Sequence, residues 1–436
     1  MASYYHNRLR IRAINYELKI AFRYLFAKRS NGGLSAIAWY SLIGVMLSVA
    51  TLIVIQSVMI GFREEFVSKI LGANAHLSIY SNSFVANKRV GIDEEIQSSI
   101  DDLIKDQFDI VTAMPIINET VMVSSGSRNF GVQVFGVEAE DLLDIPLIAS
   151  PEYEEGSIEN FNEGVAIGSV LARQLGIGLG SNIRLISPSG AKTAFGITPR
   201  AIDVNVSYIF SVGRYDIDST RIYMPMDNAI TYFGRNGLVD RLDIMVLDPN
   251  NIEKIADKIS LELEKIKGET FVIWTWKQAS NSFLSALDIE RKAMFVIWSL
   301  VVLIAALNII SGLVMLVKNK TQNIAILRTI GFSKYSIMRI FFIAGSMIGL
   351  TGTFLGIVLG CTFALNLQAI QSGVELIFGG SVWDPQVRYL TQIPVKLRLN
   401  DILSATLISL VISFLITIFP SYRAASLNPV DGLRNG

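Results

Sequence analysis

The sequence predicts an α-helical membrane protein with four transmembrane helices and a large α+β extracytoplasmic domain between helices 1 and 2. Three observations lead to this fold class. The 436 residues are 51% hydrophobic and only 17% charged, whereas soluble domains are about 25% charged. Four long stretches lack Asp, Glu, Lys and Arg. The segment of about 230 residues between the first two stretches is large enough to fold as a domain of its own.

The four charge-free stretches predict membrane spans at residues 34–62, 293–317, 340–374 and 402–422. Each is long enough to cross a bilayer as a helix. The first stretch begins at residue 30, so as a helix it would measure about 50 Å against roughly 30 Å of hydrocarbon. We therefore expect the first helix to continue beyond the membrane surface.

Charge asymmetry predicts the orientation, because cytoplasmic flanks of membrane spans concentrate Lys and Arg. Residues 1–33 contain seven basic residues and one acidic residue, and residues 318–339 contain five basic and no acidic residues. Residues 63–292 instead contain 21 basic and 33 acidic residues. We predict that both termini, including residues 423–436, and the loop 318–339 are cytoplasmic. The domain at 63–292 and the loop at 375–401 then face the other side.

Hydrophobic periodicity predicts the organisation of the outer domain as two β-α-β units, at residues 70–130 and 233–290, around an inserted strand-rich subdomain at 130–232. The first unit has expected strands at 76–80 and 120–124 and an amphipathic helix at 93–105. The second has expected strands at 241–247 and 270–274 and a helix at 252–266. A further strand is expected at 132–137.

Signatures of catalysis are missing from the sequence. There is no G-x-x-x-x-G-K-[ST] phosphate loop, and Cys361, His6 and His76 are too few for a zinc cluster. A net charge of zero gives no basis for nucleic-acid binding. No predicted span contains an ionisable residue, which an ion-coupled carrier normally needs. We expect no catalytic residues, no metal and no cofactor, so another protein must supply the energy.

Five strings, spread over essentially the whole chain, carry a resemblance. They are Ile20-Ala-Phe-Arg23-Tyr24-Leu, Ser57-Val-Met59-Ile-Gly61-Phe62, Ile70-Leu-Gly72 through His76, Ile324-Ala-Ile-Leu327-Arg328-Thr-Ile-Gly331, and Pro420, Arg423-Ala-Ala425, Pro429 and Leu433-Arg434. In this order and with this topology, the sequence resembles the permease subunits of the bacterial lipoprotein-releasing Lol ABC transporter. That family lies within the superfamily of macrolide-efflux and cell-division permeases. Ile60 and Asn323 depart from the family, which usually has Asn and an acidic residue at these positions.

The resemblance implies a non-catalytic subunit of the bacterial inner membrane with a periplasmic domain. Its expected partners are a cytoplasmic ABC ATPase that binds ATP and Mg²⁺, a second permease that is identical or paralogous, a periplasmic lipoprotein carrier, and triacylated lipoprotein substrates. The alternatives are a mechanotransmitting permease of the efflux or cell-division type, and a membrane receptor or scaffold without transport.

The cytoplasmic loop at 318–339 is basic and carries an apolar series, Ile324, Leu327 and Ile330. The resemblance implies that this loop is the coupling helix that docks on the ATPase. The residues expected to take part are Ile324, Ala325, Ile326, Leu327, Arg328 and Gly331. The pattern alone fits equally well a positively charged anchor whose apolar residues extend the spans.

Residues 187–200 contain two prolines and two glycines, which predict a protruding turn between two strands. In the Lol family the matching hairpin is a hook that captures the periplasmic carrier. The hook residues implied here are Pro188, Gly190, Lys192, Phe195, Gly196 and Pro199. An ordinary surface loop would have the same composition.

Three further patterns concern the membrane. An apolar cavity for acyl chains between two permease subunits could be lined by Met46, Val49, Ile53 and Met59, although each could equally face lipid or pack within the subunit. Glycines recur in four-residue steps at Gly345, Gly349, Gly352, Gly356 and Gly360, which predicts close helix packing within the subunit or at a dimer seam. A helix in the membrane interface is predicted from Ile14, Leu18, Ala21, Phe22 and Leu25.

Overall fold

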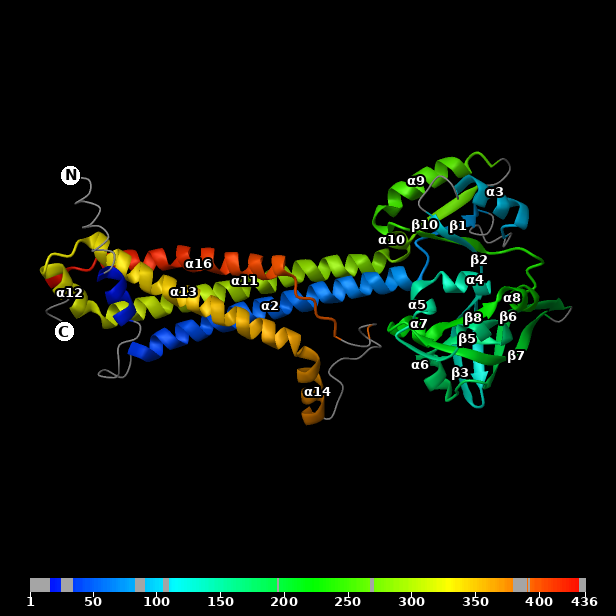
Figure 1. Cartoon of the computed structure of the whole chain (residues 1–436), viewed down its shortest axis with the longest axis horizontal. Helices are drawn as coiled ribbons and strands as arrows, with labels where there is room; N and C mark the ends of the chain where they lie inside the picture. The colour runs from blue at the N-terminus through cyan, green and yellow to red at the C-terminus, as the bar shows by residue number, and fades with distance from the viewer. Residues whose placement is uncertain are drawn as a thin grey trace. The chain divides into compact units, whose positions relative to one another are not determined.

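The computed structural model describes residues 16–24, 34–82, 91–104, 110–193, 196–266, 270–378, 390 and 393–430 (Figure 1). The chain divides into two compact units, each described here by itself. The helical unit comprises residues 1–63, 287–380 and 393–436, and the sheet unit comprises residues 64–286 and 381–392.

Four long helices build the helical unit. They are α2 (Leu34–Ala73), α11 (Asn281–Asn319), α13 (Lys334–Leu365) and α16 (Leu399–Ala425). Two of the helices, α2 and α11, extend beyond this unit. All four are long and apolar enough to cross a membrane, which confirms the four predicted helices. The first helix continues well past Phe62, as its length predicted, so that residues 64–73 of α2 belong to the sheet unit. Among the residues that the structure describes, the unit also contains three short helices: residues 16–24, α12 (Thr321–Thr329) and α14 (Leu367–Phe378).

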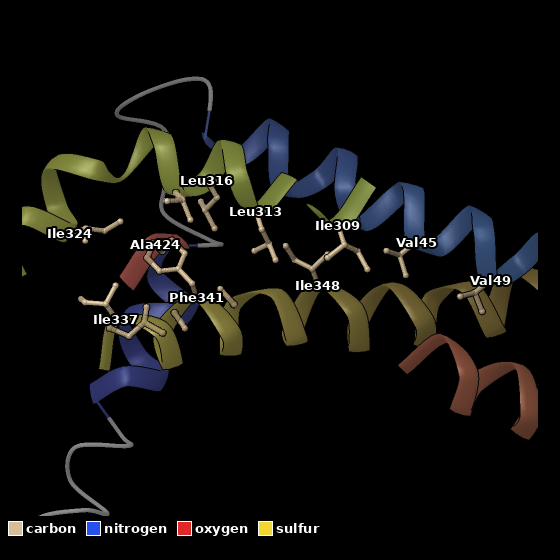
Figure 2. Packing of buried hydrophobic residues seen from close by; sticks show 14 of the residues in the cluster. Val45, Val49, Ile309, Leu313, Leu316, Ile324, Ile337, Phe341, Ile348 and Ala424 are labelled. Carbon is tan, nitrogen blue, oxygen red and sulfur yellow. The ribbon is translucent and has the colours of Figure 1, made fainter. Parts of the chain in front are cut away.

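The glycine row of α13 packs against two helices of the same chain. Gly352, Gly356 and Gly360 face α2, where a Cβ on Gly356 would lie 2.7 Å from the Met46 carbonyl oxygen. Gly345 and Gly349 face α16 at Thr417 and Ser413. Figure 2 shows Val45 and Val49 of α2 and Ile309 and Leu313 of α11 facing α13, whose Ile348 belongs to the same buried cluster. The glycines therefore serve packing within the subunit, which was one of the two predicted roles.

The third predicted span, 340–374, differs from the structure. The helix α13 ends at Leu365, and a separate helix, α14, begins at Leu367. Between them Asn366 leaves the helical conformation, and its side-chain amide donates a hydrogen bond to the Thr362 carbonyl at 2.8 Å. A continuous helix over the predicted range would measure about 52 Å, far more than a bilayer's hydrocarbon requires.

The two predicted β-α-β units join in one sheet. The first consists of β1 (Leu77–Ser81), α3 (Glu94–Ile104) and β2 (Ile110–Ser125), and the second of β9 (Arg241–Val246), α9 (Ile252–Leu263) and β10 (Phe271–Thr275). Their strands lie in the order β10-β1-β9-β2, with every neighbouring pair antiparallel. This is a split β-α-β arrangement, in which a strand of one unit lies between two strands of the other.

The segment between β2 and β9 forms, together with β2, a closed ring of six strands. The segment supplies β3 (Arg128–Val137), β5 (Val165–Gly168), β6 (Asn182–Thr193), β7 (Gly196–Ser211) and β8 (Arg221–Pro225) to the ring, and also contains β4 (Tyr153–Gly156). The order β2-β3-β8-β5-β7 is closed because β6 pairs with both β7 and β2, while β4 adds to β7. The long strand β2 belongs to both sheets: residues 110–116 pair with β9 and residues 117–125 with β3.

Short helices surround this ring. They are α4 (Ala139–Leu143), α5 (Pro146–Ala149), α6 (Ser169–Leu175), α7 (Tyr215–Thr220) and α8 (Met226–Phe233), with the 3-10 helix η2 (Ile158–Glu163). The 3-10 helix η3 (Pro249–Asn251) and α10 (Trp276–Ala279) flank α9 and β10. Large buried side chains, including Phe161, Tyr208, Phe210 and Tyr223, fill the core and account for the stability of an inserted domain that the sequence outlined only by its strands.

Candidate functional site

The cytoplasmic loop forms the helix α12 and presents a different face from the one the sequence predicted. Ile324 is buried in the hydrophobic cluster at this end of the bundle, with Ile337 and Ala424 close by (Figure 2), and Ala325 is also buried. Leu327 packs partly against the same cluster. The predicted apolar series is therefore divided. Its first two members, Ile324 and Leu327, pack the loop against the permease itself.

The outward side of α12 and its C-cap carries Ile326 and the C-cap residue Ile330, which are 42% and 72% exposed. They are four residues apart, so they lie next to each other on one side of the helix. After α12 the chain turns through Gly331, whose φ of +110° favours glycine. The Arg328 guanidinium donates to the Phe332 carbonyl at 3.1 Å and braces this turn. Arg328 and Gly331 thus shape the loop, and the two isoleucines form its exposed apolar pair.

The helix of residues 16–24 packs on both ends of this loop. Glu17 is buried and lies 3.8 Å from the Arg339 guanidinium at the start of α13. The ring of Tyr24 lies 5.3 Å from the Lys320 ammonium, just before α12. Leu18 and Phe22 remain exposed, as an interfacial helix requires, whereas Ala21 is buried against the bundle. Of the predicted apolar face, Ile14 and Leu25 lie outside the described residues.

The predicted turn at 187–200 is a long hairpin whose strands continue almost to the tip. The register pairs Ser187 with Arg200 and, after a bulge, Thr193 with Gly196. Pro188, Gly190 and Lys192 therefore lie in β6, and Gly196 and Pro199 in β7, because backbone pairing continues beyond the range expected from the prolines and glycines. Phe195 lies outside the described residues. Among the described strands, only β7 pairs with β6 beyond Ile186, so this arm extends out of the ring.

The base of the arm is held by polar contacts. Arg184 on β6 and Asp203 on β7 form a two-pronged ion pair with distances of 2.7 and 2.8 Å. The Arg200 guanidinium donates to the Tyr232 carbonyl at 3.1 Å. Burial raises the pKa of the Tyr232 hydroxyl to about 12. These contacts fix the direction in which the arm leaves the ring.

The four residues predicted to line a cavity between two subunits differ in burial within this subunit. Val49 and Ile53 are buried, and a Cβ on Gly356 would lie 2.7 Å from the Val49 Cβ. Met46 and Met59 are half-buried. Packing of α13 against α2 therefore covers Val49 and Ile53 within the subunit, and the cavity between two subunits stays a prediction.

The outer end of α2 is held in the sheet unit by polar side chains that no sequence pattern indicated. The Arg221 guanidinium donates to the Ala73 carbonyl and to the Asn74 side chain, both at 2.7 Å. His76 accepts a hydrogen bond from the Val246 amide at 3.0 Å, and its other ring nitrogen lies 3.2 Å from the Leu71 carbonyl. Burial lowers the pKa of His76, which keeps the ring neutral and suited to this pair of bonds. The Arg221 cation at the C-terminus of α2 is also stabilising, because a positive charge there interacts favourably with the helix dipole.

Two family models match the chain. The model of the MacB-like periplasmic core domain matches residues 39–261, and that of the FtsX-like permease C-terminal region matches residues 295–429. The first match covers more than half of the chain. The chain belongs to the family defined by the MacB-like periplasmic core domain.

Relatives in this family match the chain over almost its whole length. A lipoprotein-releasing system transmembrane protein LolC of Neisseria meningitidis is 28% identical over 96% of this chain and 99% of its own. A LolC of Xylella fastidiosa is 28% identical over 95% of this chain and 98% of its own. A LolE of Haemophilus influenzae reaches the same identity over 95% of this chain and 98% of its own. The predicted family resemblance is confirmed, and both LolC-type and LolE-type proteins are among the relatives.

Family membership indicates in which membrane the four long helices lie. The chain is a multi-pass inner-membrane permease with a large periplasmic domain between α2 and α11. Among the described residues, no group of three or more His, Cys, Asp or Glu side chains could hold a metal ion. The candidate functional surfaces are therefore the apolar pair on α12 and the β6–β7 arm.

Proposed function

We propose that this chain is the membrane subunit of an ABC transporter that extracts lipoproteins from the inner membrane and passes them to a periplasmic carrier. The observation that carries the proposal is the match to lipoprotein-releasing proteins over 95–96% of the chain and 98–99% of theirs. Such coverage means that the spans, the periplasmic domain and the β6–β7 arm all lie within the matched length.

Lipoprotein release requires an energy source and a carrier because of the size of the apolar anchor. A triacylated lipoprotein has three chains of about fifteen methylenes each, and at about 0.8 kcal/mol per methylene their exposure to water would cost about 35 kcal/mol. Spontaneous release is therefore negligible. The transporter must use ATP and must transfer the chains between apolar environments.

The helix α12 would couple the free energy of ATP hydrolysis to this chain. This chain has no phosphate loop, so a separate cytoplasmic ATPase subunit would bind ATP and Mg²⁺. The exposed pair Ile326 and Ile330 lies in a loop with five basic and no acidic residues, and apolar anchors of this kind fit a groove on a protein partner. Asn323, at the start of α12, has no charge for the ion pair that the family usually offers at this position.

The lipoprotein would leave through the periplasmic arm. The arm beyond Ser187 is paired only within itself among the described residues and is anchored at its base by Arg184 and Arg200. A projecting, anchored hairpin can contact a soluble carrier without disturbing the ring. The second permease of the complex would be an identical or a paralogous chain, since LolC and LolE proteins match this sequence with the same identity.

The experiment removes the arm and keeps the ring. Residues 188–199 are replaced by Asn-Gly, because Ser187 and Arg200 face each other across the hairpin and a two-residue turn can join them. We expect carrier binding to be lost and lipoproteins to accumulate in the inner membrane, while ATPase binding is unchanged. A photo-crosslinker at Lys192 should capture the carrier, whereas one at the exposed Lys258 of α9 should not.

Two results would contradict the proposal. Full lipoprotein release and normal carrier binding by the shortened protein would exclude the arm as the hand-over site. Absence of any carrier contact in the intact protein would instead favour an efflux or cell-division type of permease, or a scaffold. Mild-detergent purification that identifies the co-purifying ATPase and second permease separates the transporter from a scaffold.

A further inference from the structure

The short helix α14 follows the third membrane helix directly, and its residues 367–374 fell within the predicted third span. Only Asn366 separates it from α13. Figure 1 shows α14 bent away from the axis of α13. Its twelve residues contain no Lys or Arg and one acidic residue, Glu375.

The position of α14 along the chain places it at the outer membrane surface. The charge-free part of α13 runs from residue 340 to Leu365, which corresponds to about 39 Å of helix against roughly 30 Å of hydrocarbon. The chain enters at the cytoplasmic loop, so by Leu365 it has just passed through the apolar layer. The helix α14 then begins at the boundary between the outer leaflet and the periplasm.

One side of α14 is both apolar and exposed. Leu376 and Ile377 are 86% and 75% exposed, and Ala369 and Gly373 are exposed on the same side. At 100° per residue, these four positions fall within about a third of the helix circumference. Gln368 lies about 180° from Ile377 and is also exposed. The helix therefore separates an apolar side from a polar side.

The adjoining helix α13 also exposes apolar side chains. Phe354, Val358 and Leu365 of α13 are exposed in the same unit, as expected for a helix that contacts lipid. Ile377, an exposed apolar side chain of a helix without a basic residue, would be unfavourable in water. Lipid is already the environment of the adjoining helix.

We propose that α14 is an interfacial helix that binds the phospholipid surface of the outer leaflet through Ala369, Gly373, Leu376 and Ile377. Amphipathic helices of this kind lie in the membrane plane, with the apolar face about 5–10 Å deep. Since α14 has no basic residue, its binding depends on apolar contact and not on anionic headgroups. This inference requires only the membrane topology and is independent of lipoprotein release.

The test measures the depth of both sides of α14. Single cysteines are introduced at Ile377 and at Gln368 in full-length protein in which Cys361 is replaced by alanine, and each is labelled with bimane. The protein is reconstituted into phosphatidylcholine vesicles that contain nitroxide-labelled lipid, with and without phosphatidylglycerol. We expect lipid nitroxide to quench the label at position 377 several-fold more strongly than the label at position 368, with no effect of phosphatidylglycerol. Aqueous iodide should show the opposite preference.

Three outcomes would overturn the proposal. Equal quenching of the two labels by lipid nitroxide would mean that α14 does not lie on the membrane. Protection of position 377 from both lipid nitroxide and iodide would mean that a protein surface covers it. A several-fold increase with phosphatidylglycerol would mean that headgroup charge drives the contact. Leu376→Cys gives a second probe of the apolar side if the first labelled protein is not monodisperse.

Discussion

The exposed apolar pair on α12 gives a sharp prediction about coupling to the ATPase. Fully burying an isoleucine side chain contributes about 1.5–3 kcal/mol. Ile330 is 72% exposed in this chain, so burial against a partner would still contribute about 1–2 kcal/mol. We therefore expect Ile330→Ala to weaken ATPase binding by about 5- to 30-fold. Ile330→Asp should abolish binding, because an unpaired carboxylate would enter an apolar groove.

The assay is a titration of purified ATPase onto the permease in lipid nanodiscs. Ile289→Ala is the matched control, since Ile289 is 66% exposed on α11 and far from α12 in the sequence. Substitution of Ile324 is unsuitable, because this residue is buried in the permease and its loss would destabilise the bundle. Leu327, which packs partly against the same cluster, has the same drawback.

The coupling argument can fail in two ways. Unchanged ATPase affinity in Ile330→Asp would show that this face of α12 does not dock. An equal loss of affinity in Ile289→Ala would show that any exposed isoleucine of the membrane unit has the effect. In either case the loop would be a positively charged anchor, which is the alternative that the sequence left open.

Two further predictions concern stability. Gly356→Ala should lower the thermal unfolding temperature of the permease in nanodiscs, because the added Cβ would lie 2.7 Å from the Met46 carbonyl oxygen and overpacking costs about 1–3 kcal/mol; Gly373→Ala, which meets no atom within 4 Å, should not lower it. Burial raises the pKa of Asp218 to about 6, so the fold favours its neutral form. That stabilising contribution is complete at pH values below the ordinary carboxyl pKa and is lost as pH rises through about 6. The unfolding temperature of Asp218→Asn relative to wild type should therefore rise between pH 5 and pH 7.5, and a pH-independent difference would refute the assignment.

The sequence by itself determined the four spans, their orientation and the position of the large domain. These features depend on hydropathy and on the distribution of Lys and Arg along the chain, and neither requires knowledge of contacts. The β-α-β elements were also predictable, because each has a local periodicity that marks one buried face. The helix at 16–24 was expected for the same reason.

Only the tertiary structure decided which of these surfaces are free. The α12 pattern offered Ile324, Leu327 and Ile330 as one face, but packing buries the first and leaves Ile330 outside. Packing on α13 likewise buries Val49 within the subunit. A periodic pattern indicates that a helix has an apolar side. It does not indicate what covers that side, because lipid, another helix and a partner protein all favour the same residue types. Which neighbour covers an apolar side depends on contacts between residues far apart in the sequence. Such contacts bury Val49 against α13 and leave Ile330 exposed.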